Sequence, residues 1–294
     1  MKLILLLLIF SISLFSSVIK NEKNLELENF KHRDIEAKSA MQNWLNGYFG
    51  LKPYKPNYLL PYGYTKHDYK SYSSDVYYNQ EAELQISLKI PISKNLFGLD
   101  GTYYLSYSQK SFWQIYTKSS PFRETNYNPE AFVVFPIFSD ISGFKLRSVK
   151  FSLAHMSNGQ GNKSVLPNGN VVNRSRSINY IYTDIAFQND TLLTDFTLMT
   201  PYLGAGDLSD NPDIMDYLGY TAVKFTYFRG KNMFTLMGRG NLVTRRGAIE
   251  FTYSHPILKT KTYFYAKIFS GYMESLIDYN HELTKFSIGF AFSR

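Results

Sequence analysis

A histidine and a serine stand two residues apart at the end of a segment that alternates between apolar and polar residues. The run reads His-Met-Ser-Asn-Gly at 155–159 and closes the stretch 149–157. A serine attacks an ester only when a base removes its proton and a third group orients that base. Residues two apart in a β-strand point to the same face, so His155 and Ser157 share the apolar face of this stretch. The pattern indicates a substrate that arrives from a hydrocarbon phase.

An asparagine in a second alternating segment belongs on the same face. Asn179 follows Ser157 by twenty-two residues and lies in segment 175–188, where the residues of its own parity are mostly apolar. If segments 146–158 and 175–188 are neighbouring antiparallel strands, Asn179 faces the same side as the histidine and the serine. Gly159 would leave its backbone N–H free to approach a developing oxyanion.

The N-terminus has the features of a secretory signal peptide. A lysine at position 2 precedes an apolar run to Phe10, and small residues follow at Ser13, Ser16 and Ser17. We interpret residues 1–17 as the signal, with the cut near 16–19, and 18–56 as a periplasmic N-terminal segment. The alternative is an uncleaved anchor. The chain contains no cysteine, so neither a disulfide nor a lipid attached through cysteine is expected.

The composition favours a membrane barrel over a soluble enzyme. Aromatic residues make up 17% of the chain, with 25 Tyr and 23 Phe, yet the mean hydropathy is only −0.25. Transmembrane β-barrels combine aromatic girdles at both interfaces with a polar lumen that lowers the overall hydropathy. The net charge of +8 comes without a clustered basic stripe or a nucleic-acid motif, so nucleic acid is not an expected partner. Lysines and arginines that face anionic lipid headgroups explain the positive net charge more simply.

Alternating segments predict an all-β, twelve-stranded antiparallel transmembrane barrel over residues 57–294. The clearest is 82–90, which is apolar at every even position and polar at every odd one. A soluble sandwich is the alternative for such alternation, but the signal peptide, the aromatic content and the absence of helical patterns after residue 50 favour the barrel. The expected strands are 57–64, 82–90, 102–115, 129–136, 146–158, 175–188, 194–203, 217–228, 232–241, 246–254, 260–272 and 285–293.

Five separated motifs, in order, resemble the outer-membrane phospholipase A family. The first two are the 155–159 run and Ser-Arg-Ser-Ile-Asn at 175–179. The other three motifs are Ser-Ser-Pro-Phe-Arg-Glu-Thr-Asn-Tyr at 119–127, Asp-Asn-Pro-Asp-Ile at 210–214 and Gly-Tyr-Met-Glu-Ser-Leu-Ile-Asp-Tyr-Asn at 271–280. The likeness runs from about residue 57 to near the C-terminus.

This resemblance implies a calcium-dependent enzyme that hydrolyses phospholipid acyl esters, with phospholipase A1, A2 and lysophospholipase activity, in the outer membrane of a Gram-negative bacterium. Its partners would be membrane phospholipids and, when active, a second copy in a homodimer. By motif, Ser157 would be the nucleophile, His155 the general base and Asn179 the group that orients the imidazole. An asparagine oxygen can accept the imidazole N–H and fix its tautomer, at less cost in an apolar setting than a bare carboxylate.

The same resemblance implies oxygen ligands for Ca²⁺ beside the oxyanion. These would be the Ser175 side chain, the Gln160 carbonyl and Ser119 of the partner subunit, while Asp210 matches a calcium position in the monomer. Oxygen-only ligands suit this hard cation. The chain departs from the family over 160–174, which is a longer connection than usual and has no aspartate soon after Gly159.

Gln109 places a polar amide in an otherwise apolar column with Tyr103, Leu105 and Tyr107. Such an amide is costly in lipid unless it finds a partner. The family has a glutamine here that bonds across the dimer interface, which would supply that partner. The alternative is that Gln109 lies at headgroup depth and contacts water.

Two other functions fit a barrel. One is a passive pore or structural barrel with a decayed site, and the other is a lipid A deacylase. The deacylase family uses an acid as the third member of its triad and has a smaller barrel. Asn179 and the strand count therefore argue against it.

Overall fold

The computed structural model describes residues 50–66, 69, 77–141, 144–161, 164–165, 169, 171–202, 208–257 and 261–294. The predicted signal peptide at 1–17 and residues 18–49 of the predicted periplasmic segment lie outside these described residues. Within the described ranges, no helix is both long and apolar enough to cross a membrane.

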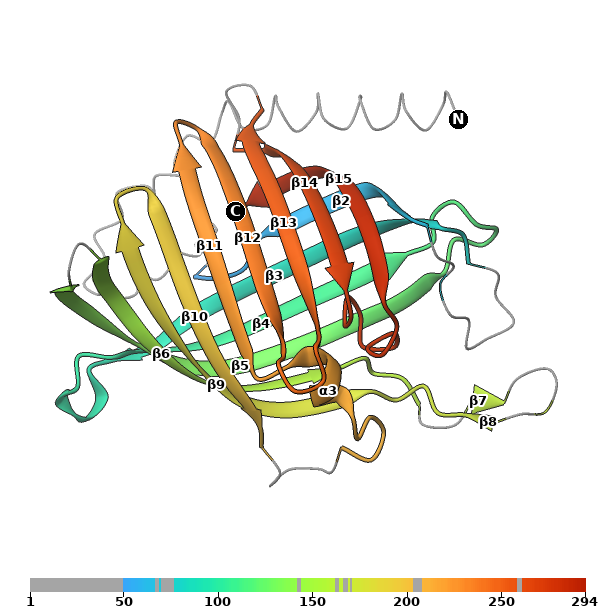
Figure 1. Cartoon of the computed structure of the whole chain (residues 1–294), viewed down its shortest axis with the longest axis horizontal. Coiled ribbons are helices and arrows are strands. Elements are labelled where there is room, and N and C mark those ends of the chain that lie inside the picture. Colours follow the sequence, from blue (N-terminus) through green and yellow to red (C-terminus); the bar gives the residue numbers. More distant parts are fainter. Residues whose placement is uncertain are drawn as a thin grey trace, which may run out of the picture. The chain divides into compact units, whose positions relative to one another are not determined.

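Twelve antiparallel strands form a closed barrel (Figure 1). Among the described residues, five short elements accompany them: β1 (Lys52–Pro53), η1 (Leu96–Gly98), β7 (Ser164–Val165), β8 (Val171–Val172) and α3 (Ile214–Leu218). The barrel strands are β2 (Asn57–Thr65), β3 (Gln80–Lys94), β4 (Thr102–Trp113), β5 (Phe122–Ile141), β6 (Phe144–Ser157), β9 (Ser177–Asn189), β10 (Leu192–Pro201), β11 (Thr221–Arg229), β12 (Asn232–Asn241), β13 (Arg246–Pro256), β14 (Tyr263–Gly271) and β15 (Leu283–Ser293).

The barrel closes because its last strand pairs with its first. β15 pairs with β2, β2 with β3, and each later strand with its neighbour along the chain. A closed ladder confirms the predicted twelve-stranded barrel and excludes the open sandwich, since no strand edge of the ring stays unpaired. Strand β1 also pairs with β3, through Lys52 and Lys89, so pairing begins five residues before the predicted start at 57. The division into signal, periplasmic segment and barrel stays a prediction.

Two predicted strands differ from the observed ones. The segment expected at 129–136 is the much longer β5, whose first residues belong to a motif rich in polar side chains that point into the barrel. The first two residues of the segment expected at 217–228 are the end of helix α3, and β11 starts only at Thr221. The expectation of no helix after residue 50 was therefore wrong. An Asn-Pro-Asp run before an apolar turn is a helix-start signal, and Gly219, at φ +82°, ends the helix.

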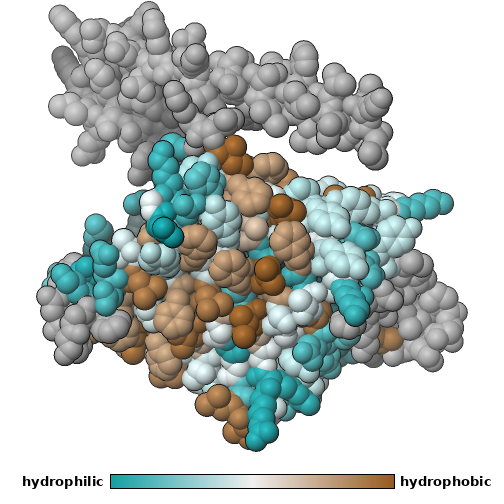
Figure 2. Space-filling model, turned by 45° about the horizontal axis from the view of Figure 1, so that its top comes forward, coloured by the Kyte–Doolittle hydropathy of each residue, from teal (hydrophilic) through white to brown (hydrophobic). Residues whose placement is uncertain are grey.

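The two faces of the barrel wall have opposite chemistry. Apolar side chains cover the outer face, and one such area is visible in Figure 2. The alternation explains this arrangement, because successive side chains of a strand point to opposite faces. Apolar side chains that stay exposed on an isolated barrel are those that hydrocarbon would cover; they include Leu105, Phe151, Leu153, Ile181, Leu198, Leu236, Ile268 and Phe286.

A buried ionic network fills one part of the interior. Glu81 accepts hydrogen bonds from Arg123 Nε and from Lys285 Nζ, each at 2.8 Å. Lys267 pairs in the same way with Glu83, and all five side chains are almost fully buried. The loop between β14 and β15 adds two more carboxylates, so strands far apart in the sequence are joined across the lumen; these are Glu274 and Asp278.

Replacing Glu81 with glutamine is expected to destabilise the barrel strongly. The change leaves Arg123 and Lys285 without this carboxylate in a buried site, which costs about 3–5 kcal/mol for a broken buried pair. The free energy of unfolding, from guanidinium titration of the barrel in micelles, measures the loss.

Asp195→Asn is the matched control. It breaks the 2.8 Å pair with Lys224, whose side chains are 29% and 47% exposed, and the cost should stay below about 1 kcal/mol. Equal effects of the two variants would contradict the assigned burial.

Candidate active site

His155 and Asn179 are directly opposed on neighbouring strands. The two residues are register partners in the pairing of β6 with β9. The imidazole Nδ1 lies 2.7 Å from the Asn179 side-chain oxygen. The predicted neighbourhood of the two segments is thus confirmed, and both side chains lie on the outer face together with the exposed Leu153 and Ile181. A lipid-facing wall therefore carries a hydrogen-bonded histidine.

Ser157 is the last residue of β6 and is held from both sides. It is a register partner of Ser177 in β9 and of Tyr127 in β5. The chain then turns at Gly159, whose φ is +63°. A Cβ there would also lie 3.1 Å from the ring of Tyr127. Glycine suits this position for two reasons, because it adopts positive φ freely and leaves room for the ring.

Asn158 fixes the turn that follows the serine. Its side-chain oxygen accepts the backbone N–H of Gln160 at 3.3 Å and that of Arg176 at 3.0 Å. Its side-chain nitrogen donates to the Arg174 carbonyl at 2.8 Å, and the residue is only 3% exposed. One amide thus joins the end of β6 to the segment that leads into β9, although a long connection separates them in sequence.

Asn211 holds the start of β9 in a similar way. Its side chain accepts from the Ser177 N–H and donates to the Ser177 carbonyl, both at 2.9 Å, and it is fully buried. Because Ser177 is a register partner of Ser157, this amide supports the serine from the opposite strand. Neither Asn158 nor Asn211 was assigned a role from sequence. The only signal was their position inside two of the five motifs.

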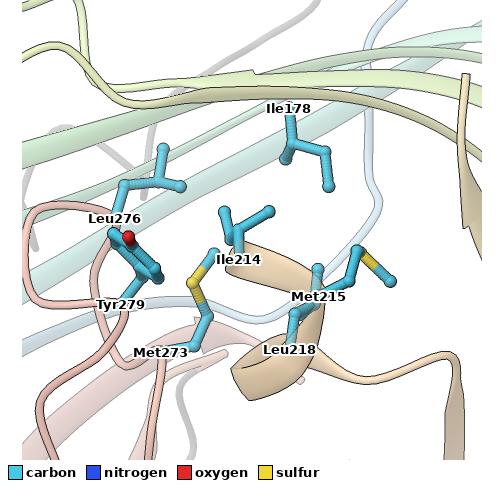
Figure 3. Packing of buried hydrophobic residues seen from close by; sticks show 7 residues of the cluster. All are labelled: Ile178, Ile214, Met215, Leu218, Met273, Leu276 and Tyr279. Atoms are coloured by element: carbon cyan, nitrogen blue, oxygen red, sulfur yellow. The ribbon is translucent and has the colours of Figure 1, made fainter. Parts of the chain in front are cut away.

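A hydrophobic cluster supports the two strands from inside the barrel (Figure 3). Ile178 lies between Ser177 and Asn179 and points inward, and Met156, between the histidine and the serine, packs against the same cluster. Helix α3 and the β14–β15 loop supply the other side chains. The reacting face is therefore supported by packing on its opposite face; the remaining cluster members are Ile214, Met215, Leu218, Met273, Leu276 and Tyr279.

Oxygen donors gather near the start of β9. The Ser175 side chain hydrogen-bonds the Asp210 carboxylate. This hydrogen bond is the main reason why the pKa of Asp210 lies below its ordinary value. Asn173 contributes to the same shift by donating to Asp210 at 2.7 Å. In the described part of the chain, no three acidic or histidine side chains cluster as a metal site. The Ser175 hydroxyl and the Asp210 carboxylate offer oxygen atoms, which suit a hard cation such as Ca²⁺.

Ser119 and Gln109 lie on the neighbouring part of the barrel. Ser119, at φ +64°, belongs to the turn between β4 and β5. Gln109 accepts from the Tyr107 hydroxyl at 3.0 Å and donates to the Ser111 hydroxyl at 3.3 Å. The amide is thus partly satisfied by its own strand, which lowers its cost in lipid without a second subunit.

Comparison with known proteins places the chain among lipid hydrolases. The family model for phospholipase A1 matches residues 34–292. Phospholipase A1 of Proteus vulgaris is 36% identical over 248 residues, covering 82% of this chain and 81% of that protein. The outer membrane phospholipase A of Escherichia coli, in an asparagine-to-alanine active-site mutant, superposes with a TM-score of 0.71 at 33% identity, covering 83% of this chain and 92% of that one. The Salmonella typhi outer membrane phospholipase dimer with bound calcium gives 0.72 at 33% identity, with the same coverages.

The family model spans most of the chain, and the Proteus relative covers more than two thirds of it. The barrel also matches the solved outer membrane enzymes over nearly their whole length. The chain therefore belongs to the phospholipase A1 family and is an outer-membrane β-barrel enzyme that hydrolyses phospholipids.

Proposed function

We propose that the chain cleaves phospholipid acyl esters with Ser157 as nucleophile, His155 as general base and Asn179 as the orienting group. The observation that carries this proposal is the 2.7 Å bond between His155 Nδ1 and Asn179, on the lipid-facing wall and beside the serine. The active-site asparagine of the related Escherichia coli enzyme supports the same assignment. The active barrel reaches the outer membrane of a Gram-negative cell through its signal peptide.

The tautomer follows from the chemistry of the amide. The Asn179 oxygen can only accept, so Nδ1 of His155 carries the proton and Nε2 is left as the base. Ser157 Oγ attacks the acyl carbonyl while Nε2 takes its proton. The C–O bond of the ester then breaks, and the imidazolium returns the proton to the leaving lysophospholipid oxygen. Water hydrolyses the acyl-serine by the same route, which releases the fatty acid and restores the serine.

The oxyanion is stabilised at the turn after β6. Gly159 follows the nucleophile Ser157 by two residues, and the positive φ of Gly159 turns the chain at this point. We assign the stabilising N–H to Gly159. An N–H that is fixed in advance stabilises developing charge without reorganisation. Asn158 supplies that fixation, because its side-chain oxygen accepts from the backbone of Gln160 after the turn and from that of Arg176 in the segment that leads into β9.

Calcium is the proposed cofactor, held by the Ser175 hydroxyl, the Gln160 carbonyl and Ser119 of the partner, with Asp210 in a monomer site. When bound, the cation would supply positive charge beside the oxyanion. The Ser175–Asp210 contact supports the grouping of two of these residues. The related Salmonella typhi structure contains calcium.

The active form is proposed to be a homodimer, in which two copies of the chain contact each other along the wall that carries Gln109. Leu105 and Tyr107 are exposed on the same face of β4, so a second copy would bury apolar area there. A cation site that needs Ser119 from the partner couples dimerisation to activity. The relative from Salmonella typhi is a dimer.

Ser157→Ala is expected to lower phospholipid hydrolysis at least about 10³-fold, because the nucleophile is lost. Asn179→Ala should cost about 100-fold, since the imidazole loses its orientation. Release of fatty acid from mixed micelles with Ca²⁺ measures both rates. Covalent labelling of Ser157 by a sulfonyl fluoride is the second readout, and it should slow in Asn179→Ala. Full hydrolysis by Ser157→Ala would overturn the nucleophile assignment.

Asn158→Ala should reduce the turnover number about 10- to 100-fold through displacement of the turn, while the serine and histidine stay in place. The apparent KM should change little, because the lipid-facing wall is unaltered. Steady-state kinetics separates the two parameters. Asn189→Ala, an exposed amide at the other end of β9, is the control and should retain full activity. A rise in KM alone would contradict the positioning role.

Removal of calcium with EDTA should abolish hydrolysis reversibly. Ser175→Ala and Asp210→Asn should each raise the calcium concentration needed for half-maximal rate about tenfold, since each removes one oxygen donor. Asp190→Asn, an exposed carboxylate on the turn between β9 and β10, should leave that concentration unchanged. Full activity in EDTA would refute the cofactor, and a specific activity independent of protein concentration in detergent would refute the dimer.

A further inference from the structure

The outer wall has a hollow over β11–β14, away from the proposed active site. It encloses about 610 Å³. Gly238, Gly240 and Gly247 contribute its floor, because they leave three outward positions of β12 and β13 without side chains, while the exposed Ile249, opposite Gly238, lines one side. Just below it, the outer face carries a continuous belt of large apolar side chains, which are Phe225, Leu236, Phe251, Ile268 and Phe286.

The hollow lies at the same end of the barrel as the proposed active site. Strand β6 ends at Ser157, and β12, which runs parallel to it in the ring, ends at Asn241. Tyr272 borders the hollow, and the exposed Tyr220 stands beside it at the head of β11. Tyrosines at the end of a barrel wall mark the level of the lipid headgroups. The hollow is therefore a headgroup-level depression above the apolar belt.

Two opposite charges border this depression. Arg245 is exposed at the turn between β12 and β13. Glu282 is exposed directly before β15, where its carboxylate accepts from the Tyr272 hydroxyl at 3.2 Å. Two other arginines in its lining are directed elsewhere. Arg239 donates to the carbonyls of the inner loops, and the Arg246 guanidinium stacks 4.5 Å from the Tyr217 ring.

The turn that carries Arg245 is fixed. The Asn241 side chain accepts from the backbone N–H groups of Val243 and Thr244, and the Thr244 hydroxyl donates to the Asp216 carbonyl at 2.6 Å. At its tip, Leu242 and Val243 are 90% and 91% exposed. Apolar side chains this exposed on a rigid turn are costly in water and suit contact with lipid.

We propose that this depression is a non-catalytic binding site for a zwitterionic phospholipid of the phosphoethanolamine class. Its phosphate pairs with Arg245 and its ammonium with Glu282, while the glycine floor takes the glycerol region and the apolar belt takes the acyl chains. A guanidinium and a carboxylate on one rim match a headgroup that carries both charges. An anionic lipid would satisfy the arginine but oppose the glutamate.

Gly238 allows a direct test, because a Cβ built there meets nothing within 4 Å. Gly238→Leu therefore places a side chain in the depression with no close contact at its Cβ. Glu282→Gln and Arg245→Gln remove one charge each, and Arg229→Gln, an exposed arginine at the opposite end of the barrel, is the control. The probes are diether phosphatidylethanolamine and diether phosphatidylglycerol with identical chains, which contain no acyl ester. Native mass spectrometry measures lipid retained by the purified barrel, and circular dichroism confirms that each variant is folded.

Wild-type protein and Arg229→Gln should retain one phosphatidylethanolamine about tenfold better than phosphatidylglycerol. Gly238→Leu should lose this preferential retention. Glu282→Gln should bind both lipids equally, and Arg245→Gln should retain neither. Equal retention of phosphatidylethanolamine by the wild type and Gly238→Leu, or a wild-type preference for phosphatidylglycerol, would overturn the proposal. Because no ester is cleaved, the result does not depend on whether Ser157 is the nucleophile.

Discussion

Closure of the backbone hydrogen-bond ladder is the constraint on which the rest of this structure depends. In hydrocarbon an unpaired N–H or C=O costs several kcal/mol, so the twelve strands must form a ring. The ring is completed where β15 meets β2. Once it is closed, every strand has one face toward lipid and one toward the lumen. The apolar outer wall, the ionic interior and the outward position of His155 and Asn179 all follow from this alternation.

At the level of the site, packed side chains in the interior support the outer face. Ile178 and Met156 alternate with the outward Asn179, His155 and Ser157, and they pack against α3 and the β14–β15 loop. Packed interiors resist displacement because small shifts lose many close contacts. The hydrogen-bonded pair on the outer wall is thus held by contacts on the other side of the sheet. An enzyme that takes its substrate from the membrane can place its reacting groups in lipid and its supporting contacts inside.

Two sets of buried polar groups have different tasks in the barrel. The network of Glu81, Glu83, Arg123, Lys267 and Lys285 joins distant strands, and each of its charged groups takes part in a direct ion pair. The amides of Asn158 and Asn211 instead satisfy backbone groups where the regular ladder ends. A neutral amide can donate and accept at once, so it suits a turn in which both kinds of backbone group are left over. Charge thus stabilises the lumen, while amides shape the turns.

The sequence by itself determined the fold class, the strand alternation and the shared face of the histidine, serine and asparagine, because these follow from a period of two residues. Helix α3, the inner cluster and the supporting amides were decided only by tertiary structure. Helix α3 is a single short turn, and its partners lie on β9 and on the β14–β15 loop, far away in sequence. Likewise, the glycines of the outer depression are scattered over β12 and β13 and become one floor only through strand register. Local periodicity specifies which face a residue occupies, whereas register and loop packing decide what it meets there.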